Sequence, residues 1–142
     1  MPGTIHLKVI TPSKRLLDED VNMVILRGTE GDMGIMPGHE NRLAALGFGA
    51  LRAFGAEGEM NRLAVLGGFA EIRGDSVTVL SDAAEWADEI DAARAAAAKL
   101  RAEHRLQQAE EGVDMQRAEL ALRRALVRIE VSSYPLIKDR RG

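Results

Sequence analysis

The sequence predicts a β-sheet domain followed by a helical hairpin. The two parts differ in composition, because 12 of the 14 glycines lie before residue 75, whereas 14 of the 21 alanines lie within residues 83–125. They also differ in hydrophobic period, which is two residues at first and three to four residues from about Asp88 onward. The length of 142 residues fits one average domain or two small ones. We expect a β domain over 1–84, a hairpin over 85–134 and a tail over 135–142.

Short β-strands account for the first part. Residues 5–9 alternate between apolar and polar side chains, which is the pattern of a half-buried strand. Aliphatic and β-branched runs indicate further strands within 22–27, 63–69 and 72–80. The pair Gly67-Gly68 predicts a bulge or a close backbone approach inside one of them. Many short strands with glycine turns and no helical period between them are typical of an antiparallel sandwich or barrel.

Two helices, about 88–111 and 115–131, account for the second part. Gly112 lies where a helix C-terminus favours glycine, so the two helices form a hairpin with a tight turn. The expected contact face is rich in alanine. It comprises Ile90, Ala93, Ala97, Leu100 and His104 on the first helix and Met115, Ala118, Leu122, Ala125 and Ile129 on the second.

Acidic residues precede both helices and are candidates for their N-caps. Asp88 or Asp91 caps the first helix, and Asp114 caps the second, because a carboxylate can accept the free N–H groups of a first turn. An alanine contact buries little apolar area at ~25 cal/mol per Å², so it holds the helices together weakly. We therefore expect the hairpin either to lean on the β domain or to separate and extend.

Several classes of protein are excluded or disfavoured. The chain has no cysteine, which removes disulfides and thiolate chemistry, and a net charge of −3 does not favour nucleic-acid binding. No apolar run approaches the ~18 residues of a membrane span, and the N-terminus does not resemble a secretory signal, so a cytoplasmic location follows by default. His6, His39 and His104 lack metal-ligand spacing, and no triad or carboxylate pair can be placed. We expect neither a metal site nor an enzyme that acts alone.

The segment 28–39 is rich in glycine and has two interpretations. Loops on a rigid sheet often carry binding residues, so it is a candidate binding loop. Glycine also supplies the positive φ angles of ordinary β-turns, which is the simpler interpretation. A phosphate loop is disfavoured, because no Gly-Lys-Ser/Thr sequence follows.

Arginines on the two helices form a second candidate site. Arg94 and Arg101 are seven residues apart on the first helix, and Arg124 and Arg128 are one turn apart on the second. If these faces meet, four guanidiniums surround an anion such as a nucleotide triphosphate. The alternative is a pair of solvated faces whose arginines pair with nearby glutamates. Those glutamates are Glu103, Glu110, Glu111 and Glu119.

Four segments together resemble the epsilon subunit family of bacterial F-type ATP synthase, over about residues 4–131. Gly31–His39 matches the Gly-acidic-x-Gly-Ile-x-Pro-Gly-His loop of the family. Gly67–Phe69 and Val77–Leu80 match its later strands, and Arg117–Ala125 matches its second helix. The order and spacing of the segments make the resemblance specific. Met36, where the family commonly has a bulkier or aliphatic residue, and the tail 135–142 depart from the pattern.

The resemblance implies a ten-stranded β-sandwich of two five-stranded sheets, followed by the hairpin. It implies a non-catalytic subunit of the central stalk, at the cytoplasmic face of the cell membrane, that couples ion flow to ATP synthesis. The β domain would dock on the gamma subunit and on the c-subunit ring. By the loop match, Gly31, Asp32 and Met33 would face the c-ring and His39 would lie near gamma. An extended hairpin would reach the alpha/beta catalytic head and inhibit ATP hydrolysis.

A finer resemblance concerns ATP. Some family members bind ATP with the folded hairpin through an Ile/Leu-Asp-x-x-Arg-Ala motif, which Ile90–Ala95 matches. ATP, with or without Mg²⁺, would then be a regulatory ligand, and no cofactor would be required. Trp86, just before the hairpin, would report the docking of the helices by fluorescence. A free-standing ATP sensor and a β-sandwich adaptor with a helical arm are the alternative functions. The implied ATP-binding residues are Glu85, Ile90, Asp91, Arg94, Ala95, Arg101, Arg124 and Arg128.

Overall fold

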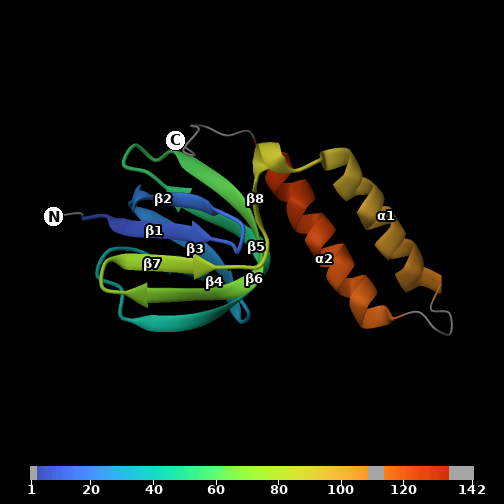
Figure 1. Cartoon of the computed structure of the whole chain (residues 1–142), viewed down its shortest axis with the longest axis horizontal. Coiled ribbons are helices and arrows are strands. Elements are labelled where there is room, and N and C mark those ends of the chain that lie inside the picture. Colours follow the sequence, from blue (N-terminus) through green and yellow to red (C-terminus); the bar gives the residue numbers. More distant parts are fainter. Residues whose placement is uncertain (1–2, 109–113, 135–142) are drawn as a thin grey trace.

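A computed structural model describes residues 3–108 and 114–134, and these form a β domain with two helices beside it (Figure 1). Gly112 and the tail 135–142 lie outside the described residues. The strands are β1 (Ile5–Ile10), β2 (Arg15–Val21), β3 (Met23–Gly28), β4 (Gly31–Ile35), β5 (Arg42–Phe54), β6 (Met60–Arg73), β7 (Ser76–Leu80) and β8 (Ala84–Trp86). A short 3-10 helix, η1 (Ala87–Glu89), then leads to α1 (Ala92–Gln108) and α2 (Met115–Ser132).

The strands form one mixed eight-stranded sheet in the order β2-β1-β7-β6-β5-β3-β4, with β8 beside β6. Strands β1 and β7 run parallel, and the other pairs are antiparallel. The expectation of a β domain followed by two helices is confirmed. The expectation of ten strands in two five-stranded sheets is wrong for this sheet, and so is that of purely antiparallel pairing.

The long strand β6 helps to explain why the sheet has eight strands and not ten. Strand β6 pairs with β8 through residues 63–65 and with β7 through residues 69–73, so one strand serves two parts of the domain. The junction lies at Gly67 and Gly68, whose φ angles are 81° and 112°. A Cβ on Gly68 would lie 2.0 Å from the carbonyl oxygen of Leu80, so the close backbone approach predicted at this pair is present.

One hydrophobic core draws side chains from all eight strands, because the sheet curls around its inner face. Ile5, Leu7 and Val9 are at most 1% exposed, which confirms the alternation seen in the sequence. Strand β6 is buried on both faces: Leu63 and Val65 point into this core, whereas Ala64 and Leu66 face the other way, toward α2.

Helix α2 lies between the sheet and α1 (Figure 1). Its Val127 and Val131 pack on the outer face of β5 and β6 in a second, smaller cluster with Ala64 and Leu66. Helix α1 packs on α2 and forms the outer layer of the molecule. The hairpin therefore leans on the β domain in this structure, as one of the two sequence alternatives expects.

The contact face of α1 differs from the prediction. Ala95 and Ala102 are buried, whereas Ala93 and Ala97 are exposed and Leu100 is 66% exposed. The alanine-rich run over 92–98 is compatible with several helical faces, so the prediction chose the face that contains Leu100, and that face is exposed. On α2 the predicted Ala118 and Ala125 are buried. The alanine seam is thus formed by Ala95, Ala102, Ala118 and Ala125.

Candidate functional site

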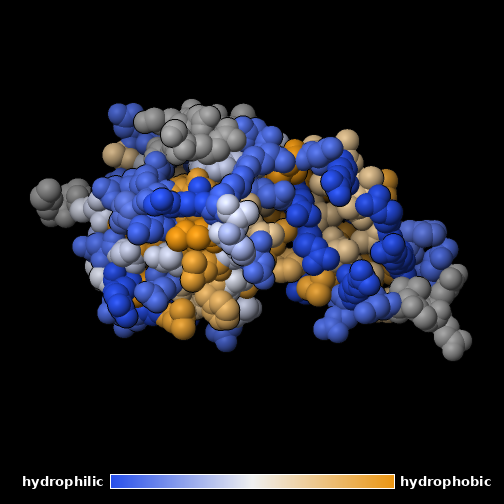
Figure 2. All heavy atoms as spheres, viewed as in Figure 1, coloured by the Kyte–Doolittle hydropathy of each residue, from blue (hydrophilic) through white to orange (hydrophobic). Residues whose placement is uncertain are grey.

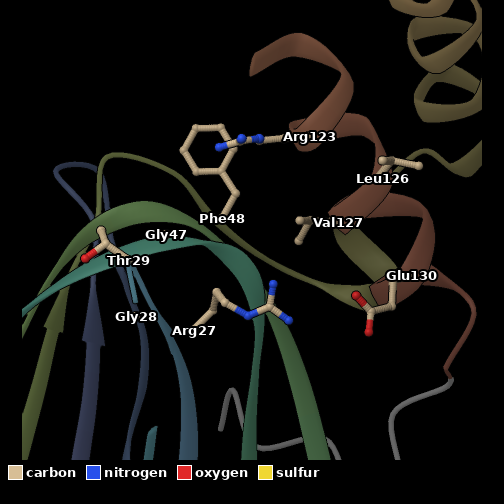
Figure 3. Close-up of a pocket in the computed structure, with 9 residues that line it drawn as sticks. All are labelled: Arg27, Gly28, Thr29, Gly47, Phe48, Arg123, Leu126, Val127 and Glu130. Carbon is tan, nitrogen blue, oxygen red and sulfur yellow. The ribbon is translucent and has the colours of Figure 1, made fainter. Parts of the chain in front are cut away.

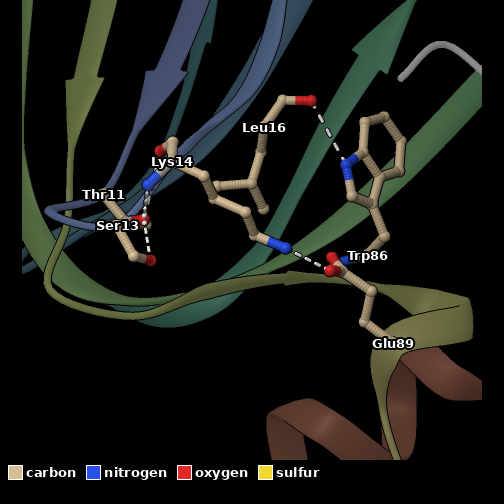
Figure 4. A network of polar contacts seen from close by, with 6 residues as sticks. All are labelled: Thr11, Ser13, Lys14, Leu16, Trp86 and Glu89. Carbon is tan, nitrogen blue, oxygen red and sulfur yellow. Dashed lines mark hydrogen bonds and ion pairs between the residues drawn. The ribbon is translucent and has the colours of Figure 1, made fainter. Parts of the chain in front are cut away.

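The connection between the β domain and the hairpin is anchored in the β core. Trp86, at the end of β8, is 1% exposed, and its indole Nε1–H donates to the carbonyl oxygen of Leu16 at 3.2 Å (Figure 4). The Glu89 carboxylate accepts a hydrogen bond of 2.9 Å from the backbone N–H of Trp86 and forms an ion pair with Lys14. Two side chains from the start of the hairpin are therefore attached to the segment that begins β2.

Aspartates cap both helices. The Asp91 carboxylate accepts a 3.0 Å hydrogen bond from the backbone N–H of Arg94, so Asp91 and not Asp88 is the N-cap of α1. Asp114 makes the same 3.0 Å contact with the backbone N–H of Arg117 and caps α2, as predicted. The Asp91 carboxylate thus fixes the orientation of the first turn of α1.

A cavity of about 390 Å³ lies where α1 and α2 meet the end of β8. All eight residues that the resemblance assigns to ATP line this single cavity. They are Glu85, Ile90, Asp91, Arg94, Ala95, Arg101, Arg124 and Arg128. The structure therefore brings together side chains from β8, from α1 and the residues just before it, and from α2. Spacing along the sequence alone could not show that these segments meet.

Sequence reasoning missed four residues that also line the cavity. Ala98 continues the face of Ala95 one turn later, and Ala121 and Ala125 flank the arginines of α2, so helical spacing could have found these three. Glu89 is the fourth. Glu89 precedes α1, so helical spacing did not point to it, and only its position next to the predicted residue Ile90 could have suggested it.

Guanidiniums outnumber carboxylates by one in the lining of the cavity. Four guanidiniums face three carboxylates, and Arg128 Nε donates to Glu85 Oε1 at 2.6 Å. Within residues 3–108 and 114–134, Arg94, Arg101 and Arg124 have no ion-pair partner. The alternative of solvated faces paired with glutamates is thus not what the described residues show, although Glu110 and Glu111 lie outside them. Three unpaired guanidiniums around one space suit a polyanion.

A second cavity, of about 530 Å³, lies between α2 and the outer face of β3 and β5 (Figure 3). It is larger, but its charges are mixed. Arg27, on the sheet side, donates from Nε to Asp32 at 2.6 Å, and α2 contributes both Arg123 and Glu130, with Val127 between them along the helix. Neither size nor net charge distinguishes the first cavity. It is the candidate anion site because three of its guanidiniums have no ion pair among the described residues.

The glycine-rich segment forms the β3–β4 hairpin and the turns after it. Asp32, exposed at the start of β4, receives hydrogen bonds from Arg27 Nε at 2.6 Å and from Arg52 at 3.2 Å. Met33 is half-buried against the main core. His39 follows the far end of β4 and donates from Nδ1 to the carbonyl oxygen of Glu40 at 2.8 Å. The two predicted contact points, around Asp32 and at His39, are thus separated by strand β4.

Exposed apolar side chains form a strip on the β domain that the sequence did not single out. Leu43 is 69% exposed, Phe69 56% and Leu80 51%, on the adjacent strands β5, β6 and β7. Phe69 pairs directly with Leu80 across β6 and β7. Apolar atoms gather on the β domain among polar ones in Figure 2. Such a strip is a candidate protein interface, and we call Leu43, Phe69 and Leu80 the apolar strip.

A histidine between two carboxylates lies on strands β1 and β2. The His6 ring hydrogen-bonds Asp20 at 2.8 Å and contacts Asp18, which also pairs with Arg15. The hydrogen bonds to Asp20 and Asp18 raise the pKa of His6, and the hydrogen bond to His6 lowers the pKa of Asp18. Among the described residues no group of three or more acidic, histidine or cysteine side chains is suited to a metal ion. Nor is any described helix long and apolar enough to cross a bilayer.

Comparisons with known proteins cover nearly the whole chain. Residues 4–87 match the family model of the ATP synthase delta/epsilon chain, beta-sandwich domain, and residues 88–133 match that of its long alpha-helix domain. The ATP synthase epsilon chain of Bacillus velezensis is 46% identical over 129 residues, which are 91% of this chain and 97% of the relative. The epsilon chain of Halalkalibacterium halodurans is also 46% identical, with the same shares covered.

Solved structures agree. A chain in the OSCP/F1/c-ring structure of the Euglena gracilis mitochondrial ATP synthase has a TM-score of 0.80 at 28% identity and covers 94% of this chain and 84% of its own. A chain in the central stalk/c-ring structure of the Tetrahymena thermophila enzyme shares the fold, with a TM-score of 0.55 at 14% identity over 92% and 95% of the two chains. These matches confirm the resemblance, and the protein is a member of the ATP synthase delta/epsilon chain family.

Proposed function

We propose that this chain is a non-catalytic central-stalk subunit of an F-type ATP synthase that couples ion translocation to ATP synthesis. The observation that carries the proposal is the match of both parts of the chain, over residues 4–133, to the two domains of one ATP synthase subunit family. Similarity to a chain in an F1/c-ring structure supports a place in the stalk. In such a complex the chain lies at the cytoplasmic face of the cell membrane as a peripheral subunit.

Two parts of the β-domain surface are assigned to the two rotor partners, and they meet at Leu43, which lines a pocket with Gly31, Asp32 and Met33. The apolar strip, together with His39, forms the docking surface for the gamma subunit, because a strip of exposed aliphatic and aromatic side chains suits a permanent protein interface. The turn around Gly31, Asp32 and Met33 faces the c-ring. The ion pairs of Asp32 with Arg27 and Arg52 would keep this turn in one conformation.

Binding to the gamma subunit tests the stalk assignment. The purified chain is expected to bind purified gamma, and Phe69→Asp is expected to weaken the complex at least tenfold, because a charge would be buried in the apolar strip. Phe69 is 56% exposed, so this change leaves the β domain folded. Glu57→Gln, on the exposed turn between β5 and β6, is the matched control. Absence of any complex between the folded partners would refute the assignment.

The hairpin would regulate ATP hydrolysis. The folded hairpin is held by the small alanine seam and the cluster around Val127 and Val131, so it can leave the sheet without unfolding the β core. When extended, it would reach the alpha/beta catalytic head and inhibit hydrolysis. ATP in the four-arginine cavity would stabilise the folded hairpin by RT ln(1 + [L]/Kd), because the cavity requires both helices and β8 together.

Calorimetric titration of the isolated chain with ATP tests this regulation. We expect binding by the wild type, and a loss of about tenfold or more in Arg94→Ala and Arg124→Ala, because each removes a guanidinium that lines the cavity. Arg105→Ala, on the same helix α1 but outside the cavity, is the control. A flat titration at millimolar ATP would remove nucleotide regulation and leave the stalk assignment standing.

A further inference from the structure

The outer face of β6 places an arginine next to the apolar contact with α2. Side chains two residues apart on a strand share a face, so Arg62 lies on the same side of β6 as Ala64 and Leu66. Ala64 and Leu66 pack against Val127 and Val131 of α2. Arg62 is half-buried and continues this row by one position, toward the end of the helix.

The Arg62 side chain contacts the ring of Tyr134, in the turn that follows α2. The guanidinium carbon Cζ lies 3.4 Å from the centroid of the ring, well within the ~6 Å over which a cation–π attraction acts. The helix holds the ring in place, because the backbone N–H of Tyr134 donates to the carbonyl oxygen of Val131 at 3.2 Å and Val131 is fully buried. The contact therefore joins the C-terminal end of the hairpin directly to the sheet.

The ring removes water from the guanidinium without replacing its hydrogen bonds. Arg62 Nε and Nη1 are buried and have no hydrogen-bond partner within residues 3–108 and 114–134. Arg52, directly opposite on β5, differs because it donates to Asp32 at 3.2 Å. When the hairpin opens, the two Arg62 groups regain hydrogen bonds to water, which opposes the attraction of the cation to the ring. The contact therefore favours the folded hairpin but is built to be released.

We propose that Arg62 and Tyr134 form a latch, which holds the end of α2 on β6 and sets the fraction of chains whose hairpin is open. The inference rests on the proposed mobility of the hairpin and does not require ATP binding. The alanine seam holds α1 on α2, whereas the latch and the cluster around Val127 and Val131 hold α2 on the sheet. Release of the latch therefore favours departure of the two helices together, as one unit.

Native-state hydrogen exchange of the full-length chain, without nucleotide, tests the latch. Tyr134→Leu keeps an apolar side chain but removes the aromatic face, so the opening constant of the α2 amides should rise about tenfold, with the β-core amides unchanged. Tyr134→Phe keeps the ring and should stay within about twofold of the wild type. Tyr134 is 48% exposed, so neither change disturbs the core. Arg73→Gln, at the exposed far end of β6, is the control for loss of an arginine.

A double-mutant cycle separates the latch from two independent contacts. Arg62→Gln should open α2 by a factor similar to that of Tyr134→Leu, and the double variant should add less than about twofold, because both changes remove one contact. Effects that multiply in the double variant would overturn the latch, and so would equal opening by Tyr134→Phe and Tyr134→Leu. If wild-type α2 opens before the β core and no variant alters it, the hairpin is mobile but the latch is wrong. If wild-type α2 exchanges only with global unfolding, the proposed mobility fails as well.

Discussion

The β domain and the helical hairpin are held together by very different amounts of buried apolar surface. The β core is built from leucine, isoleucine and valine on all eight strands, closed by Trp86. The seam between the helices is four alanines, and only Val127 and Val131 of α2 add larger side chains on the sheet side. Stabilisation follows the apolar area removed from water, at ~25 cal/mol per Å². Opening the hairpin therefore costs much less free energy than opening the β domain.

Truncation of one core leucine gives the largest expected difference between the two regions. Leu63→Ala, at a fully buried position of β6, should lower the free energy of unfolding by about 3 to 4 kcal/mol, because it leaves a cavity in a packed core. Ala118→Gly, at a buried seam position, should cost only about 1 kcal/mol through helix propensity. Urea denaturation followed by Trp86 fluorescence measures the first change. Equal effects would show that the seam is as tightly held as the core.

The glycine junction of β6 offers the next largest effect. Gly68→Ala should destabilise the β domain by about 3 kcal/mol, because its Cβ would lie 2.0 Å from the Leu80 carbonyl oxygen and its φ is 112°. Gly58→Ala is the control, since its φ of 82° is also positive but nothing lies within 4 Å. It should cost about 1 kcal/mol. Thermal unfolding of the two variants would separate the cost of the steric contact with Leu80, present only at Gly68, from the cost of a positive φ, present at both glycines.

Overpacking of the seam should loosen the hairpin alone. Ala102→Leu, at a position 1% exposed, should push α1 away from α2 and destabilise the hairpin by about 2 kcal/mol. Hydrogen exchange of the α1 amides should then become faster, with β-domain amides unchanged. Leu100→Ala, at a position 66% exposed, should have almost no effect. If Leu100→Ala destabilised the hairpin more than Ala102→Leu, the contact face predicted from the sequence would be the correct one.

The smallest expected effect is the pH dependence of the His6 cluster. The raised pKa of His6 means that its contribution to stability is fully present below the ordinary value of 6.5 and is lost as the pH rises through the folded-state value. The lowered pKa of Asp18 means that its contribution is present above 3.8 and is lost as the pH falls. These side chains are partly exposed, so solvent screening limits the His6 contribution to about 0.5 kcal/mol.

A pH series of denaturation curves checks this sign. His6→Gln should flatten the decline of β-domain stability above pH 6.5, while the stability of the hairpin stays unchanged. A stability that rises with pH in the wild type over the same interval would contradict the assignment of His6 as the responsible group.

Local features of the chain were predictable because short-range physics decides them. The alternation of Ile5, Leu7 and Val9, the cap at Asp114 and the close approach at Gly67-Gly68 each depend on a few neighbouring residues. Helical spacing made Arg94, Arg101, Arg124 and Arg128 candidates, and the other predicted cavity residues were available only through the resemblance to a family. The spacing along each helix showed that pairs of arginines share a face, but not that the two faces meet.

Features that depend on pairing between distant segments were not predictable. The parallel contact of β1 with β7 and the division of β6 between β7 and β8 have no signature within either strand. The phase of α1 was ambiguous because a run of alanines fits several faces. Phe69 and Leu80 lie in predicted strands and Leu43 in none, and only the sheet shows that all three are exposed on adjacent strands.

The parallel pairing of β1 with β7 also fixes an order of events during synthesis. Strand β1 emerges first from the ribosome, but one of its two neighbours in the sheet ends at Leu80, so the domain cannot close until that residue has been made. The helices are encoded only after it. Strand β8, which adds Trp86 to the core, also precedes α1, so the nascent chain can complete its slow, non-local sheet before the helices are made. Translation order thus keeps the weaker part from competing with the stronger one.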